Sequence, residues 1–175
     1  MRRSHGVTVL ELIVTLAIAA LLGSMAVPTF TSLLRDNELT AAVNSFVHTI
    51  FLARSEAIKR GQVVSICKSR DHANCSGSTG RWDEGWIVFV NRDRDDPAVR
   101  DADEPLVFVN DGWRRGSITA NRTSFSFRPY TQGVVNGTVI FCDARGSAHA
   151  RAIIVSHSGR PRISQRSSSN RPLSC

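Results

Sequence analysis

An apolar run near the N-terminus constrains this 175-residue chain more than any other feature of its sequence. No charged residue occurs from Leu12 to Val27, and with its flanks this stretch approaches the ~20 apolar residues that cross a ~30 Å hydrocarbon core. Arg2 and Arg3 precede it, which places the N-terminus on the cytoplasmic side. Glu11 lies inside the run, where an unpaired charge is costly. We therefore expect one membrane-spanning segment in which Glu11 has a function.

Three interpretations of this segment compete. A secretory signal peptide would be cut after the small-x-small triplet 24–26, but Glu11 and the helical pattern beyond Ala26 argue against it. A plain membrane anchor leaves Glu11 without a role, unless its side chain reaches a lipid headgroup. The third interpretation, a prepilin, depends on the residues around Gly6.

The run Gly6-Val7-Thr8-Val9-Leu10-Glu11-Leu12 resembles the type III leader of type IV pilins and type II pseudopilins. The resemblance implies that a prepilin peptidase in the inner membrane cuts after Gly6 and methylates the new N-terminus at Val7, where the family usually has Phe. It also implies that Glu11 pairs with the freed amine of a neighbouring subunit. Such a pair would fix the register of the fibre, because a charge in low dielectric is costly without its partner. Pro28 stands where many pilins have a helix-loosening proline.

The chain beyond the membrane segment continues with helical periodicity. Apolar residues recur at spacings of three and four, which is typical of an amphipathic helix. They are Phe30, Leu33, Leu34, Val43, Phe46, Val47, Ile50, Phe51 and Ile58. Gly61 can end the helix. We expect one long helix from about Thr8 to Arg60, loosened near Gly23 and Pro28.

Short strands separated by turn signals follow the helix. They are predicted at Val63–Cys67, Trp86–Asn91, Leu106–Asn110, Ser117–Ala120, Ser124–Arg128, Thr138–Cys142, Ala152–Ser156 and Pro161–Ser164. A helix followed by consecutive strands is typical of an α+β protein with an antiparallel sheet. The expected organisation is a leader (1–6), a long helix (7–60) and a globular β-rich domain (61–175). The helix has a transmembrane or fibre-core half (7–30) and an amphipathic half (31–60), as in the type IV pilin-like fold.

Four cysteines in an exported domain indicate two disulfides, because the periplasm is oxidising. Three pairings are possible. Cys67 and Cys75 enclose a short polar loop, which favours a local bridge, and Cys142 with Cys175 would then tie the C-terminus to the core. A zinc site is disfavoured because no C-x-x-C pair occurs. The stretch 167–172 is poor in apolar residues, and we expect it to be mobile apart from this tether.

The net charge of +7 is distributed unevenly. Residues 1–70 hold 8 basic and 4 acidic residues, and residues 71–112 hold 4 basic and 10 acidic residues. Residues 113–175 hold 10 arginines and a single acid, Asp143. This asymmetry indicates an anionic partner for the C-terminal segment.

Two further stretches narrow the family. Residues 52–60 with 63–67, and the pattern Trp82-x-x-Gly85-Trp86-Ile87-Val88-Phe89, resemble the FimT/GspH family of minor pilins and pseudopilins. The resemblance covers nearly the whole chain but does not separate a pilus protein from a secretion pseudopilin. It implies other major and minor pilins as partners. It also implies an inner-membrane protein with a periplasmic C-terminal domain that later joins a pilus fibre at the cell surface.

The run Ser158-Gly159-Arg160-Pro161-Arg162 is the sharpest candidate binding motif. Arginine donates paired hydrogen bonds to phosphate, and residues two apart on an extended segment share a face. Members of the FimT branch with such a Gly-Arg-x-Arg motif bind DNA during natural transformation, and this chain is similar to them. The predicted DNA-binding residues are Arg145, Arg151, Gly159, Arg160, Arg162, Arg166 and Arg171. The alternative is a solubilising surface in a chain with 20 Arg and 2 Lys.

No catalytic, metal or cofactor site is expected, and the chain is not predicted to be an enzyme. The acidic residues 93–96 and 101–104 could hold Ca²⁺, but they lack the glycine and spacing of an EF-hand loop, and neighbouring arginines can neutralise them. We therefore expect a minor type IV pilin that binds extracellular double-stranded DNA and serves DNA uptake and pilus assembly. The alternative is a structural minor pilin or a type II secretion pseudopilin that does not bind nucleic acid.

Overall fold

The structure is a computed structural model that describes residues 6, 8–129 and 136–175. It contains two compact units, Met1–Glu38 and Leu39–Cys175. The expected cleavage site lies at the start of the first unit, where Val7 falls outside the described residues.

Helix α1 spans Val9–Arg60 and begins one residue later than predicted. Thr8 Oγ1 accepts a hydrogen bond from the Glu11 N–H at 3.2 Å, which caps the first turn. The Thr-x-x-Glu spacing could have identified this cap from the sequence. The helix runs through Gly23 and Pro28 without interruption, although Pro28 has no N–H to donate. By length and composition its apolar first part can cross a membrane.

The eight strands form two sheets. Sheet A has the order β3-β2-β1-β5, and sheet B has the order β4-β6-β7-β8, with every pair antiparallel. The strands are β1 (Val63–Lys68), β2 (Trp86–Asn91), β3 (Leu106–Asn110), β4 (Gly116–Ala120), β5 (Ser124–Phe127), β6 (Gly137–Asp143), β7 (Arg151–Val155) and β8 (Pro161–Ser164). Two short 3-10 helices, η1 (Trp82–Glu84) and η2 (Ser147–His149), precede β2 and β7.

All eight predicted strands exist, and their ends differ from the prediction by no more than one residue. The expected α+β fold with antiparallel strands is confirmed, and the strands form two sheets because β4 pairs with β6 and not with β3 or β5. Apolar alternation locates each strand but carries no information on which strand it pairs with. Two four-stranded sheets also allow each sheet to present an apolar face to the same helix.

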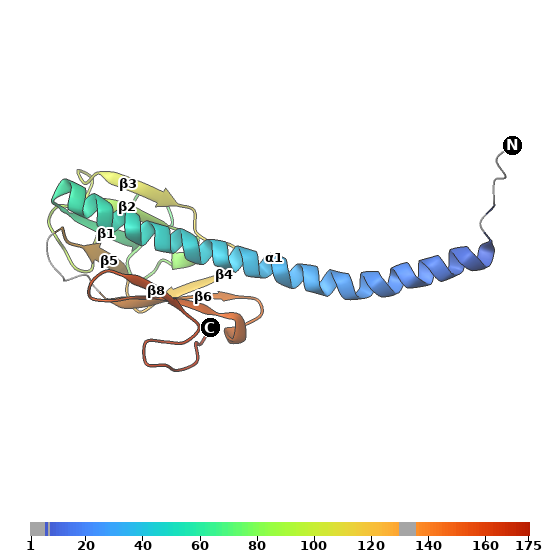
Figure 1. Cartoon of the computed structure of the whole chain (residues 1–175). Helices are drawn as coiled ribbons and strands as arrows, with labels where there is room; N and C mark the ends of the chain where they lie inside the picture. The colour runs from blue at the N-terminus through green and yellow to red at the C-terminus, as the bar shows by residue number, and fades with distance from the viewer. Residues whose placement is uncertain (1–5, 7, 130–135) are drawn as a thin grey trace. The chain divides into compact units, whose positions relative to one another are not determined.

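In the globular unit, α1 lies across both sheets (Figure 1). The buried apolar residues of its inner face are Leu39, Ala42, Val43, Phe46, Ile50, Ala53 and Ala57. The ring of Phe46 lies at the centre of this face and is fully buried. It makes edge contacts with Trp86 of β2 at a centroid distance of 5.1 Å and with Phe141 of β6 at 6.0 Å. Phe46 therefore joins the helix to both sheets.

Both disulfides have the pairing that the sequence favoured. Cys67 is bonded to Cys75, and Cys142 is bonded to Cys175. The first closes a loop next to the end of β1, and the second returns the last residue of the chain to β6. No cysteine is left to bind zinc.

The contacts of Phe46 predict a large difference between two phenylalanines on the same helix. Phe46→Ala should lower the free energy of unfolding by about 3–5 kcal/mol, because it leaves a cavity between the two sheets. Phe51→Ala should change it by less than about 0.5 kcal/mol, because that side chain is 52% exposed. Urea unfolding of the full-length protein in detergent micelles, followed by tryptophan fluorescence, measures both. Equal losses would contradict the role of Phe46.

Candidate nucleic-acid interface

The Gly-Arg-x-Arg motif forms the turn between β7 and β8 and the start of β8. The Gly159 N–H donates to the Ser156 carbonyl at 2.8 Å, and the Ser156 N–H donates to the Arg160 carbonyl at 3.2 Å. Gly159 has a φ of 71°, a left-handed conformation that glycine adopts without the steric cost of a side chain. Gly159 is buried, so its contribution is the geometry of the turn.

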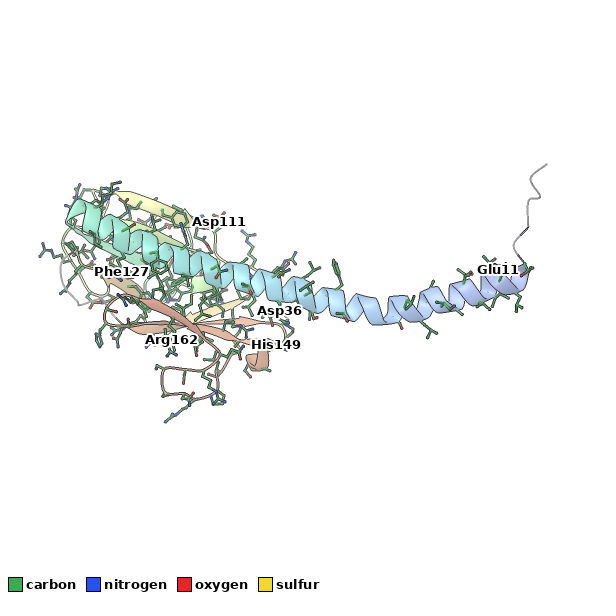
Figure 2. All side chains as sticks on the ribbon, in the orientation of Figure 1. Glu11, Asp36, Asp111, Phe127, His149 and Arg162 are labelled. Atoms are coloured by element: carbon green, nitrogen blue, oxygen red, sulfur yellow. A yellow bond between two sulfur atoms is a disulfide. The ribbon has the colours of Figure 1, made fainter. Side chains whose placement is uncertain are left out.

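Arg160 and Arg162 lie on the face of sheet B that points away from α1. The register pairs Ile153 with Ile163 and Ile154 with Arg162. Ile153 is fully buried in the main core, so the alternation of side chains along β8 places Arg162 on the opposite face. The bond from Ser156 to the Arg160 carbonyl extends this ladder by one pair, which places Arg160 on the same face as Arg162. Both arginines are exposed. β8 is the last strand of the sheet (Figure 1), and Arg162 of this strand is labelled in Figure 2.

Arg166 and Arg171 are brought together by the segment after β8. A β-bridge joins Arg166 to Pro172, and the Ser167 N–H donates to the Arg171 carbonyl at 2.9 Å. The Arg166 guanidinium donates to the Asn170 carbonyl at 3.2 Å. Both arginine side chains are exposed.

The expectation that residues 167–172 depend on Cys175 alone for their tether is wrong. Leu173 is 5% exposed and packs with Cys142, Ala150 and Ala152. A turn of polar residues is thus held between β8 and a buried leucine. The signal in the sequence was Leu173 itself, the one aliphatic residue in an otherwise polar tail.

The other two predicted DNA-binding arginines, Arg145 and Arg151, are not exposed in the way that Arg160, Arg162, Arg166 and Arg171 are. The Arg145 guanidinium donates to Asp143 Oδ2 at 2.6 Å, and the two side chains are 12% and 6% exposed. These bonds hold the pKa of Asp143 below its usual value, so the pair stays ionised. Arg151 is aligned with the buried Phe141 on the inner face, and its guanidinium donates to the His149 carbonyl at 3.3 Å. Both side chains therefore make contacts within sheet B and its loops, and neither is among the exposed arginines.

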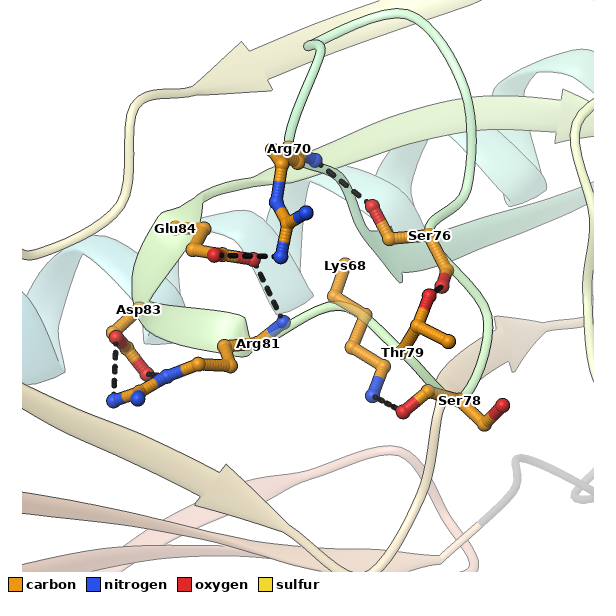
Figure 3. A network of polar contacts seen from close by, with 8 residues as sticks. All are labelled: Lys68, Arg70, Ser76, Ser78, Thr79, Arg81, Asp83 and Glu84. Atoms are coloured by element: carbon orange, nitrogen blue, oxygen red, sulfur yellow. Dashed lines mark hydrogen bonds and ion pairs between the residues drawn. The ribbon is translucent and has the colours of Figure 1, made fainter.

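Two arginines near sheet A are paired with carboxylates. Arg70 contacts Glu84 at 2.9 Å, and Arg81 contacts Asp83 at 3.0 Å (Figure 3). The bond from Arg70 lowers the pKa of Glu84. Within the described residues, no carboxylate forms an ion pair with the four exposed arginines from residue 160 onward. We call this set, which consists of Arg160, Arg162, Arg166 and Arg171, the arginine surface.

Acidic residues after β2 accept hydrogen bonds from groups of the same loop. Glu104 is 2% exposed, and its carboxylate accepts hydrogen bonds from the N–H groups of Arg92 and Asp101. Asp95 accepts a hydrogen bond from the Asn91 side chain at 2.9 Å, and burial raises the pKa of Asp95. Across residues 8–129 and 136–175, no group of three or more His, Cys, Asp or Glu side chains is arranged to hold a metal ion. Glu104 and Asp95 therefore cap groups of their own loop.

Comparison with known proteins identifies the family of this chain. The family described as type II transport protein GspH matches residues 42–159, and the prokaryotic N-terminal methylation motif matches residues 1–27. No curated protein sequence matches the chain.

Two crystal structures of the type IV minor pilin FimU from Pseudomonas aeruginosa PAO1 have a similar fold. One aligns with a TM-score of 0.54 at 21% identity, over 79% of this chain and 96% of that chain. The other aligns with a TM-score of 0.55 at 18% identity, over 78% and 98%. At these identities the likeness establishes the fold.

The methylation motif and the apolar helix α1 are those of an inner-membrane prepilin that is later delivered to a fibre. Its partners are therefore other pilins and a prepilin peptidase, and the proteins of this family are structural, not enzymatic. The chain has a prepilin methylation motif and a pilin-like fold, and it belongs to the family described as type II transport protein GspH.

Proposed function

We propose that this chain is a FimT-like minor pilin that binds extracellular double-stranded DNA through the arginine surface, and so serves DNA uptake in natural transformation as well as pilus assembly. The observation that carries the proposal is the exposure of four arginines without carboxylate partners in the β7–β8 turn, in β8 and in the segment after it, whereas Arg70, Arg81 and Arg145 are each paired with an acid. The family match ends at Gly159. The proposal therefore rests on the geometry and on the Gly-Arg-x-Arg motif.

The chemistry of the arginine surface suits a phosphate backbone. Arg160 and Arg162 share one face of an edge strand, so their guanidinium groups can donate to neighbouring phosphates. The only aromatic residue from 136 to 175 is Phe141, and its ring is fully buried. A surface without exposed aromatic rings offers no platform for stacked bases. Binding should therefore depend strongly on salt and weakly on sequence, with a slope of log K against log salt of about −3.6 for four phosphates.

A second candidate function is that of a structural pseudopilin with no nucleic-acid partner. The description of the matched family as a type II transport protein favours it. In that case the arginine surface contributes solubility or contacts to other subunits, and the protein binds DNA no better than other basic proteins do.

Paired substitutions with the same change in net charge separate the two functions. Arg160→Gln with Arg162→Gln should weaken binding about tenfold at 0.1 M salt and reduce the magnitude of the salt slope by about 1.8, because two phosphate contacts are lost. Arg70→Gln with Arg81→Gln removes two arginines that are paired with acids, and should leave both quantities nearly unchanged. The measurement is fluorescence anisotropy of a labelled 30-bp duplex titrated with the full-length protein in a nonionic detergent.

Two results would contradict the proposal. One is the absence of a complex between the wild-type protein and the duplex at low salt. The other is an equal loss of affinity in the two double variants, which would mean that net charge and not the motif determines binding.

We also propose that Gly6 and Val7 form the cleavage and methylation site and that Glu11 pairs with the amine of a neighbouring subunit. Gly6→Leu should block leader removal by a coexpressed prepilin peptidase, whereas Ser4→Ala should be cleaved normally, as intact mass reports. Glu11→Gln should be cleaved but absent from sheared fibres, because the neighbouring amine loses its counter-charge. A Glu11→Gln variant present in fibres at the wild-type level would disprove the pairing.

A further inference from the structure

The segment after β8 is fixed at both of its ends. We define residues 165–175 as the C-terminal arm. At one end it continues from β8, and at the other Cys175 is bonded to Cys142 of β6, 33 residues earlier in the chain. Between these points the Arg171 N–H donates to Ser167 Oγ at 3.0 Å and the Asn170 N–H donates to the Ser167 carbonyl at 3.0 Å. The chain beyond β8 loops outward and returns to sheet B (Figure 1).

The arm covers the same sheet face that carries Arg160 and Arg162. The register pairs Val139 with Ile153 and Ile140 with Ala152, and the first pair is fully buried against α1. Ala152 therefore points to the outer face, yet it is 0% exposed because it packs with Leu173. Leu173 thus seats the arm on the outer face of sheet B.

Leu173 is the only buried residue of the C-terminal arm. From Ser164 to Pro172 the only apolar side chain is the ring of Pro172, which is exposed. Detached from the sheet, such a segment cannot bury enough apolar surface to offset its conformational entropy. The buried leucine and the disulfide are therefore the features that keep Arg166 and Arg171 in one place.

We propose that Leu173 and the Cys142–Cys175 disulfide position two arginines for binding to a polyanion. They fix Arg166 and Arg171 on the face where Arg160 and Arg162 lie. This inference rests on the proposed DNA binding. A prearranged surface binds more tightly than a loose one because less conformational freedom is lost on association. The arm thus converts two arginines of a polar tail into part of one four-residue binding surface.

The test compares three full-length proteins in detergent with the labelled 30-bp duplex. Cys142→Ser with Cys175→Ser releases the end of the arm, and Leu173→Ser removes its apolar anchor while both disulfides remain. Each should weaken binding about tenfold at 0.1 M salt and reduce the magnitude of the salt slope by up to about 1.8, the share of Arg166 and Arg171. Cys67→Ser with Cys75→Ser, which opens the disulfide beside sheet A, should leave both quantities unchanged. Circular dichroism verifies that each variant is folded.

A double-mutant cycle separates positioning from a general loss of stability. In a protein that already carries Arg166→Gln and Arg171→Gln, release of the arm should cause no further loss of affinity, because the residues that it positions are absent. A further tenfold loss in that background would overturn the inference. So would wild-type affinity and slope in both the cysteine and the leucine variants.

The outcome also separates this inference from the proposed function. If the wild-type protein does not bind the duplex, both fail. If the wild-type protein binds and the Arg160→Gln, Arg162→Gln variant is impaired while the arm variants are not, DNA binding stands and only the positioning role is wrong.

Discussion

The packing of one helix face across two separate sheets is the interaction on which the globular unit depends. Phe46 contacts Trp82, Trp86, Phe125 and Phe141, which come from η1, β2, β5 and β6. Sheets A and B share no strand pairing, so packing on α1 joins them within this unit, together with the hydrogen bond from the Ile118 N–H of β4 to Asp83 of η1. Burial of an aromatic side chain of this size is among the larger single contributions to a small core.

The two separate sheets differ in the charged residues that surround them. The loops around sheet A contain carboxylates that pair with arginines, as in Arg70–Glu84, or cap backbone N–H groups, as Glu104 does. Sheet B retains a single acid, Asp143, which is committed to Arg145. The remaining arginines of the β7–β8 turn and the C-terminal arm therefore project a positive field that no described carboxylate cancels.

Sequence patterns predicted the elements of this protein better than their assembly. Strand positions and both disulfide pairings followed from turn residues, alternation and cysteine spacing, which are local signals. The division into two sheets did not, because strand pairing is a long-range property. Among the candidate site residues, composition pointed to arginine in general, whereas exposure and ion pairing separated Arg160 from Arg145. The role of Leu173 was hidden because one apolar residue has no periodicity.

The position of β8 at the end of sheet B has a consequence for solubility. An edge strand presents unpaired backbone groups that can add a strand from another molecule, and proteins discourage this with proline and with charged side chains. β8 has both, because Pro161 offers no donor and Arg162 brings a charge to the rim. The same segment that carries arginines for phosphate binding therefore also disfavours edge-to-edge aggregation of the sheet. A homologue with a less basic surface would need another feature to prevent strand addition at this edge.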